Sequence, residues 1–215
     1  MTTFFLSRHG ETEWHAENRY AGRTDVALTA RGLTQADDLA RWAGSAGLTS
    51  VWSSTLSRAE ITARKSAEAA GLPLSTDPRF CEVDFGDGEG LTSADMQQRF
   101  PAALEAFHRD PVTYHLPGGE DPVRAGARFI GAMDEIASSS PDARVLVVAH
   151  STVLRLVLCT HLGIDVSRYR QVFPMVKNCS ITELRRGPRA AALIVYNAEP
   201  NPHLLAHNAL AHSPH

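Results

Sequence analysis

The chain has 215 residues, of which 43% are hydrophobic and 21% charged, as expected for a single compact globular domain. Its net charge of −3, with no concentration of basic residues, gives no electrostatic basis for binding nucleic acid. The chain has no apolar run long enough to cross a membrane, and its N-terminus does not resemble a leader peptide. We therefore expect neither a membrane partner nor export. Three widely spaced cysteines form no disulfide framework, so we expect a cytoplasmic protein with buried, reduced thiols.

Short apolar runs alternate with longer amphipathic ones, which is typical of an α/β fold with a largely parallel sheet. Strands are expected at residues 4–6, 50–53 and 144–149, the last being a continuous apolar run suited to the centre of the sheet. Helices are expected at residues 29–46, 56–70, 122–137 and 152–162, the first two ended by Gly47 and Gly71 and the third begun by Asp121 and Pro122. The predicted architecture is a three-layer sandwich with helices on both faces of a mostly parallel central sheet.

Between about residues 79 and 116 the regularity weakens, with scattered proline, glycine and acidic residues. Such an insertion usually covers a site and does not build the core. We expect a single domain over residues 1–199 that includes this covering insertion, without internal repeats. Residues 200–215 contain prolines and four histidines and are expected to form a flexible, solvated tail.

Two of the predicted strands end in histidine, the first at His9 and the strand at residues 144–149 at His150. The carboxyl ends of parallel strands lie on one edge of the sheet, where α/β proteins bind ligands. The second strand leads to Arg58 near the first turn of the next helix, whose free N–H groups suit an anion. With Arg8 beside His9, two arginines and two histidines are predicted to converge, and a phosphoryl group with three equatorial oxygens suits such a pocket.

The segment Arg8-His9-Gly10-Glu11-Thr12 resembles the signature of the phosphoglycerate-mutase-like histidine phosphatases. Five blocks in the family's order, not one short motif, carry this resemblance up to about Glu199. Besides the signature they comprise Glu13-Trp14 with Glu17-Asn18-Arg19, Gly22-Arg23-Thr24-Asp25, Leu28-Thr29 and Gly32, then Ser53-Ser54, Arg58-Ala59 and Thr62-Ala63, Glu82 with Gly86 and Glu89-Gly90, Pro117-Gly118-Gly119-Glu120, and His150.

The resemblance implies a metal-independent phosphatase without a cofactor, in which His9 attacks phosphorus and the resulting phosphohistidine is hydrolysed by water. His9 must attack as the free base, and the positive charge of Arg8 and Arg58 is expected to lower its pKa from about 6.5. Arg8, Arg58 and His150 would bind the equatorial oxygens and stabilise the transition state. Glu82 matches the general acid, and a nearby phosphate dianion would favour its protonated form.

Other positions are secondary candidates for substrate binding. Asn18, Gly22 and Thr12 match positions that line the phosphate pocket in relatives. Two departures from the family pattern are counted with them: His15 replaces the asparagine that usually follows the tryptophan, and Ser151 replaces the glycine that usually follows the second histidine. The ring of His15 could donate to phosphate or turn away from it. The loop acids near Glu82, which are Asp84, Asp87 and Glu89, are interpreted as solvated.

The main alternative is a cofactor-dependent phosphoglycerate mutase, which carries a longer insertion with paired arginines and a lysine for a second phosphate. No lysine occurs between Lys65 and Lys177, and no adjacent arginines occur between Gly90 and Pro117, which favours a phosphatase. A phosphohistidine-protein phosphatase would have a shorter cover over the site. A non-catalytic phospho-ligand binding module would have lost His9, Glu82 or an arginine.

Two other hydrolase classes fit the sequence less well. The histidines lack the paired spacing of a metal site, and the residues around Ser151 lack the glycines of a nucleophile elbow. We expect the partner to be a small-molecule phosphate ester whose identity the sequence leaves open. Specificity is expected in residues 83–115 and 173–177, and a homodimer through an edge strand is considered alongside a monomer.

Overall fold

The computed structural model describes residues 1–187 and 191–201, which form a six-stranded sheet in the order β3-β2-β4-β1-β5-β6. The strands β3, β2, β4 and β1 run parallel to one another. β5 is antiparallel to β1, and β6 is antiparallel to β5. Their bounds are β1 Thr2–Arg8, β2 Ser50–Ser53, β3 Leu74–Thr76, β4 Arg144–Ala149, β5 Ile181–Arg186 and β6 Ala191–Ala198. Most of the tail expected at residues 200–215 lies outside the described residues, because these stop at 201.

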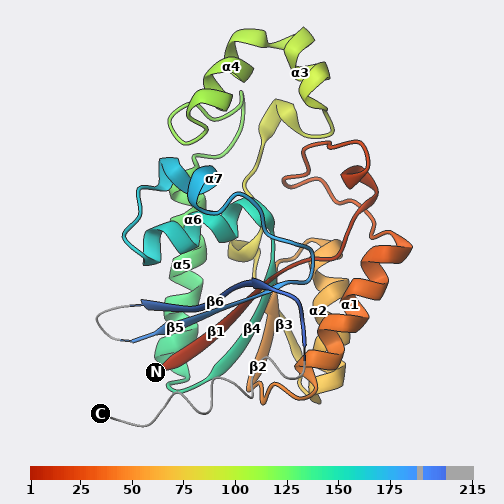
Figure 1. Cartoon of the computed structure of the whole chain (residues 1–215), viewed down its shortest axis with the longest axis vertical. Helices are drawn as coiled ribbons and strands as arrows, with labels where there is room; N and C mark the ends of the chain where they lie inside the picture. Colours follow the sequence, from red (N-terminus) through yellow and green to blue (C-terminus); the bar gives the residue numbers. More distant parts are fainter. Residues whose placement is uncertain (188–190, 202–215) are drawn as a thin grey trace.

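Helices cover both faces of the sheet (Figure 1), which confirms the predicted three-layer α/β sandwich. α1 (Ala30–Ala43) and α2 (Ser57–Ala70) pack on one face, and α5 (Pro122–Ser139) and α6 (Ser151–His161) on the other. The remaining α-helices of the described residues are α3 (Ser93–Arg99), α4 (Pro101–Arg109) and α7 (Tyr169–Val172). No helix in this described part has the length and apolar character needed to span a membrane.

The alternation of side chains along β1 divides the core into two layers. Phe4 and Leu6 contribute to the cluster beneath α5 and α6, whereas Phe5 packs with α1 and α2. The Phe5 ring meets Trp42 edge-on at 5.1 Å between centroids. β4 runs beside β1 with Ala149 opposite Arg8. Both strands therefore end at the same height, and the residues that follow them lie next to each other.

The predicted elements agree with the structure in their positions and differ at some of their ends. The Thr29 side chain accepts from the backbone N–H of Gly32 at the start of α1, and α2 ends at Gly71 with φ of 67°, as its glycine predicts. α1 stops at Ala43 and not at residue 46, because the chain leaves the helix at Gly44 and makes a turn before Gly47. The strands β3, β5 and β6 were not predicted.

The segment between residues 79 and 116 contains two short helices as well as irregular backbone. Thr92 and Asp95 cap the start of α3 reciprocally, and Pro101 begins α4. Figure 1 shows both helices beyond the end of the sheet where β1 and β4 finish. Phe107 of α4 is buried against Tyr20, at 6.0 Å between ring centroids. This segment therefore packs on the loop after β1. The expectation that it does not build the core is wrong, because its buried apolar side chains belong to the same cluster as Phe4 and Phe129.

Two glycines of the signature region allow the loop after β1 to pack directly on the start of α1. A Cβ atom at Gly10 would lie 2.4 Å from the carbonyl oxygen of Gly32, and a Cβ at Gly32 would lie 2.1 Å from the carbonyl oxygen of Glu11. Both neighbours are backbone atoms, so neither can move away without displacing its element. The sequence uses glycine at these positions because the two backbones touch.

We expect Gly32→Ala to lower the free energy of unfolding by about 2 kcal/mol or more, because the added methyl group overpacks this contact. Gly131→Ala is the matched control. Gly131 lies in the middle of α5, where a Cβ would meet nothing within 4 Å, so alanine should raise stability by about 0.5–1 kcal/mol. Denaturant unfolding of both variants measures the difference, and equal effects of the two substitutions would contradict the account.

Candidate active site

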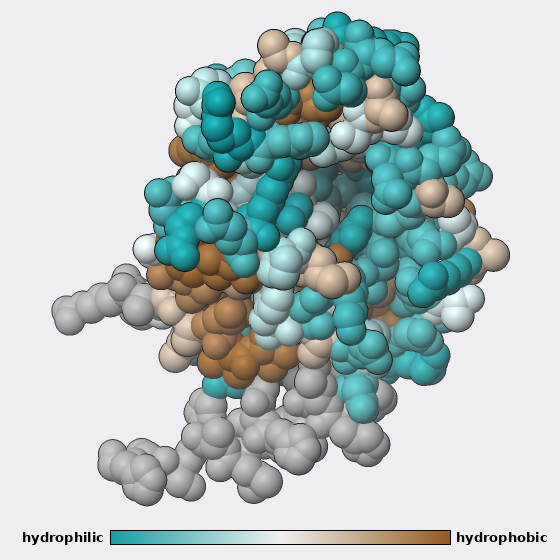
Figure 2. All heavy atoms as spheres, turned by 45° about the horizontal axis from the view of Figure 1, so that its top comes forward, coloured by the Kyte–Doolittle hydropathy of each residue, from teal (hydrophilic) through white to brown (hydrophobic). Residues whose placement is uncertain are grey.

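A cavity of about 420 Å³ opens at the carboxyl ends of β1 and β4. In the space-filling view the surface below α3 and α4 is hollowed, and hydrophilic residues surround the hollow (Figure 2). The lining comes from the loop after β1, the segment after residue 81 and the start of α6. It comprises Arg8, His9, Thr12, Trp14, His15, Asn18, Arg19, Tyr20, Ala21, Glu82, Phe85, Ser151, Thr152 and Arg155.

His9 lies on the floor of this cavity with 5% of its surface exposed. Its backbone N–H donates to Ala149 at 3.0 Å, which ties it to the end of β4. The ring atom Nδ1 lies 2.6 Å from the carbonyl oxygen of Gly10. Because a carbonyl only accepts, Nδ1 carries the proton and Nε2 keeps its lone pair for a ligand. Burial first, and then the charges of Arg58 and Arg8, lower the pKa of His9 well below its ordinary value.

His150 lies beside His9, with 5.0 Å between the ring centroids, and is 1% exposed. Its Nε2 is 2.7 Å from Oγ of Ser54, and the same oxygen accepts from the N–H of Leu56 at 3.3 Å. The Ser54 hydroxyl can therefore donate its proton to Nε2, which leaves the imidazole proton on Nδ1. Burial, followed by Arg58 and the other cations, lowers the pKa of His150 well below its ordinary value. The result is a neutral ring whose buried Nδ1 has no hydrogen-bond partner in the protein.

Arg58 is the second residue of α2 and is 1% exposed. Its two terminal nitrogens donate to the carbonyl oxygens of residues 21, 22 and 24, at 2.7–3.1 Å. Arg8 donates through Nη1 to Val176 at 2.9 Å. Burial lowers the pKa of both arginines, that of Arg8 to about 10. Both remain cationic at neutral pH.

Three buried nitrogen donors of this cluster have no protein partner: Nε of Arg8, Nε of Arg58 and Nδ1 of His150. Buried polar groups without partners are rare in folded proteins, and each such group costs about 1–3 kcal/mol. His150 contacts the ring of His9, Arg8 precedes His9 in the chain and lines the cavity with it, and the charge of Arg58 lowers the pKa of His9. Arg58 and His150 lie behind the residues that line the cavity and are not part of its lining. The arrangement suits a ligand that brings several acceptor oxygens to His9.

His15 turns toward Arg8. Its Nε2 is 2.6 Å from Nη2 of Arg8, and its Nδ1 is 2.8 Å from Oγ1 of Thr12. Arginine only donates, so Nε2 accepts from Arg8, and the backbone N–H of Thr12 also points to Nδ1, at 3.0 Å. Burial, and secondarily Arg8, lower the pKa of His15 to about 4. The ring therefore lines the cavity as a neutral group and adds no charge to it.

Glu82 is 5% exposed and holds the start of α6. Its Oε1 accepts from the N–H groups of Val83 and Val153, and its Oε2 from that of Thr152, all within 2.9 Å. A carboxyl group has about four lone-pair sites, so one remains for a proton or a ligand. Glu82 also lines the cavity, so that a carboxyl group and the buried His9 face the same space.

The backbone around Glu82 is fixed by Arg128 of α5. Its guanidinium donates to the carbonyl oxygens of Arg79, Cys81 and Glu82, at 2.6–2.9 Å. The remaining donors form a two-pronged ion pair with Glu120, at 2.8 and 2.9 Å. This geometry holds the segment that delivers Glu82 over the site.

Of the secondary candidates, Thr12, Asn18 and Ser151 line the cavity. Gly22 does not belong to the lining, and its carbonyl oxygen accepts from Arg58 at 2.7 Å. The interpretation of Glu89 as a solvated acid is wrong. Its carboxylate accepts from the N–H groups of Arg23, Thr24 and Phe85 and from the Thr24 hydroxyl, and so braces the loop behind Arg58.

Several residues that complete the site were not found from the sequence. They are Ser54 against His150, Arg128 behind Glu82, Arg155 in the cavity wall, and Asn178, whose Nδ2 donates to the carbonyl oxygen of His9 at 2.8 Å. Only Ser54 had a signal, as part of the family block. Among the residues that the structure describes, no group of three or more histidine, cysteine or acidic side chains could hold a metal ion.

Comparisons with known proteins show the family. The model of the histidine phosphatase superfamily (branch 1) matches residues 4–199, and the chain belongs to this superfamily. Phosphoserine phosphatase 1 of Hydrogenobacter thermophilus is 31% identical over 79% of this chain and 80% of its own length. A probable phosphoglycerate mutase GpmB of Proteus mirabilis is 33% identical over 86% and 85%.

Solved structures agree with this assignment. A mycobacterial glucosyl-3-phosphoglycerate phosphatase, solved with VO3, has a TM-score of 0.84 and 32% identity over 91% of this chain and 98% of its own. A putative α-ribazole-5′-phosphate phosphatase of Escherichia coli has a TM-score of 0.84 and 27% identity over 92% and 97%. The fold is the phosphoglycerate-mutase-like α/β fold, as predicted. The family and these phosphatases support the predicted enzyme class, a phosphoric monoester hydrolase.

We expect His9, His15 and His150 to stay neutral between about pH 5.5 and 8, because burial holds their pKa values below the ordinary 6.5. Nitrogen NMR of histidine-labelled protein measures this, and imidazolium signals from these rings near neutrality would contradict it. The unfolded chain takes up protons below about pH 6.5, where the folded rings do not, so the free energy of unfolding should fall as the pH falls. His15→Asn should reduce that fall.

Proposed function

We propose that the protein hydrolyses a small phosphate monoester through a phosphohistidine on His9, without a metal ion. The observation that carries the proposal is the set of three buried, unpartnered donors around His9, contributed by Arg8, Arg58 and His150. A phosphoryl group offers three equatorial oxygens, and in such a site the donors stabilise the charge of the transition state.

In the first step the lone pair of His9 Nε2 attacks phosphorus while the bond from phosphorus to the ester oxygen breaks. Glu82 gives its proton to the departing oxygen, so that an alcohol leaves. The hydrogen bond from Nδ1 to Gly10 holds the ring in the tautomer that can attack. Because the pKa of His9 is low, no proton has to be removed from Nε2 first.

In the second step water attacks the phosphohistidine. Glu82, now a carboxylate, accepts a proton from the water, the bond between nitrogen and phosphorus breaks, and inorganic phosphate leaves. His9 regains its lone pair and Glu82 its proton. The cluster of Arg8, Arg58 and His150 can stay in place through both steps, because the phosphoryl oxygens carry the negative charge throughout.

The similarity to a probable phosphoglycerate mutase supports a second candidate function. In a mutase the phosphohistidine would pass its phosphoryl group to another hydroxyl group and not to water. The same cluster would serve both reactions, so product analysis has to separate them. The relatives named as phosphatases for phosphoserine, glucosyl-3-phosphoglycerate and α-ribazole-5′-phosphate supply the first compounds to test.

We expect the wild type to release inorganic phosphate from at least one such ester in the presence of a chelator, and His9→Ala to lower the rate by at least about a thousandfold. Phosphate release and conversion of 3-phosphoglycerate to 2-phosphoglycerate should be measured side by side, with circular dichroism as the control for folding. Isomerisation without release would favour the mutase. Full activity of His9→Ala would exclude the phosphohistidine.

Glu82→Gln should lower kcat for alkyl phosphates by about a hundredfold or more, because the alkoxide then leaves without a proton. For 4-nitrophenyl phosphate, whose leaving group hardly needs the proton, we expect less than about a tenfold loss. The amide also turns a donor toward an N–H group at the start of α6, so thermal unfolding has to be measured on the same sample. Equal losses on both substrates would remove Glu82 from the role of acid.

A further inference from the structure

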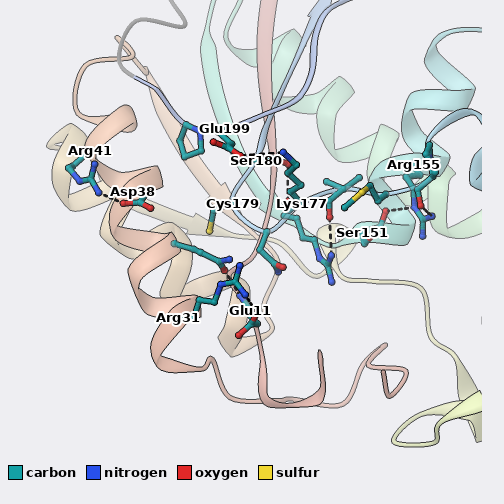
Figure 3. Close-up of a pocket in the computed structure, with 17 residues that line it drawn as sticks. Glu11, Arg31, Asp38, Arg41, Ser151, Arg155, Lys177, Cys179, Ser180 and Glu199 are labelled. Carbon is teal, nitrogen blue, oxygen red and sulfur yellow. Dashed lines mark hydrogen bonds and ion pairs between the residues drawn. The ribbon is translucent and has the colours of Figure 1, made fainter. Parts of the chain in front are cut away.

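Arg155 lies in the wall between two cavities. It is one turn beyond Ser151 on α6 and lines the catalytic cavity with His9 and Glu82. It also lines an adjoining cavity of about 610 Å³, which shares Arg8, Ser151 and Arg155 with the first. Figure 3 shows this second cavity, with Arg155 at one side of it near the segment that carries Lys177.

Arg155 differs in its ion pairing from the other basic residues that line the two cavities, leaving aside Arg8. Four of these are paired with acids: Arg19 with Glu17, Arg31 with Glu11, Arg41 with Asp38 and Lys177 with Glu199. For Arg155, the contacts found within the described residues are to neutral groups. Like Arg8, which belongs to the cluster around His9, Arg155 has no ion pair with a carboxylate among the described residues.

The side chain of Arg155 is nevertheless held in place. Nε donates to the carbonyl oxygen of Ser151 at 3.1 Å, and Nη1 is 3.5 Å from that of Pro174. The guanidinium stacks over the buried ring of Tyr169, at 4.8 Å from the centroid. These contacts leave the Nη2 donors uncommitted and reduce the conformational entropy that a ligand would have to remove.

The position on α6 fixes which part of a substrate would reach Arg155. Glu82, the proposed acid, accepts from Thr152 and Val153 at the first turn of the same helix, so this side of the cavity receives the leaving group. Four residues of helix separate Ser151 from Arg155, a rise of roughly 6 Å. An anion at Arg155 would therefore belong to the leaving group, only a few bonds from the ester oxygen.

We propose that Arg155 forms a second anion site and that the substrate is a phosphorylated short-chain carboxylic acid, whose carboxylate pairs with this guanidinium. The proposal rests on the phosphatase activity proposed above. Arginine binds a planar carboxylate through two parallel hydrogen bonds. Because the substrate carboxylate would pair with the unpaired charge of Arg155, the acid is a better substrate than the same ester without its carboxylate. Arg155 thereby determines specificity and takes no part in the transfer of the phosphoryl group.

The experiment compares two matched pairs of esters that differ only in the carboxylate: O-phosphoserine with O-phosphoethanolamine, and 3-phosphoglycerate with 2-hydroxyethyl phosphate. The selectivity is the ratio of kcat/KM within a pair. We expect the wild type to prefer the acid in at least one pair, and Arg155→Met to reduce that ratio by about 10- to 100-fold, chiefly through KM. Arg155→Lys, which keeps the charge but not the fork, should fall between the two.

Arg64→Met is the control for loss of one positive charge, because Arg64 is exposed on α2 and pairs with Glu60; its selectivity should equal that of the wild type. An unchanged ratio in Arg155→Met, or a wild type that hydrolyses both members of each pair equally well, would overturn the second anion site and leave the phosphatase standing. A wild type that hydrolyses no ester at all, including 4-nitrophenyl phosphate, would overturn the proposed function itself.

Discussion

Burial of positive charge beside His9 is the constraint on which the rest of the site depends. Removing a cation from water costs several kcal/mol unless polar groups replace the lost hydration. For Arg58 that replacement is made by the carbonyl oxygens of residues 21, 22 and 24. These carbonyls point at Arg58 because Glu89 accepts from the neighbouring N–H groups on the same loop. The chain thus supports the cation with backbone dipoles and leaves its Nε donor without a protein partner.

The same constraint explains why the histidines are neutral. The sequence predicted that the charges of Arg8 and Arg58 lower the pKa of His9, and they do, but burial is the larger cause and the arginines come second. A protonated ring would add a further charge beside the two buried arginines, Arg8 and Arg58. Neutrality gives each histidine a separate task, which its hydrogen bond decides. Gly10 holds the proton of His9 on Nδ1 and leaves a lone pair on Nε2, whereas Ser54 contacts Nε2 of His150 and leaves its Nδ1 without a protein partner.

The convergence of strand ends could be predicted from the sequence because it depends on local signals. A continuous apolar run marks β4, and a histidine follows it. Parallel pairing then brings His9 and His150 to one edge, as the register of Arg8 with Ala149 shows. The residues that were missed act across long separations in sequence. Arg128 contacts backbone 46 to 49 residues away, and no periodicity or turn pattern encodes such contacts. β6 was missed since it is an edge strand whose side chains are mostly half-buried, which weakens the alternation that identifies a strand.

The replacement of asparagine by His15 shows how a departure from a family pattern can preserve the electrostatics of a site. An asparagine amide can offer either a donor or an acceptor to the cavity. The imidazole of His15 offers Arg8 an acceptor at Nε2, while its Nδ1 lies against the hydroxyl and the backbone N–H of Thr12. With the pKa of the ring at about 4, the substitution changes the pocket by one orienting contact and by no charge. Arg8 is then fixed on both sides, by Val176 at Nη1 and by His15 at Nη2, and its Nε remains the donor that faces no protein group. A residue that could have added a third positive charge instead restrains an arginine that is already there.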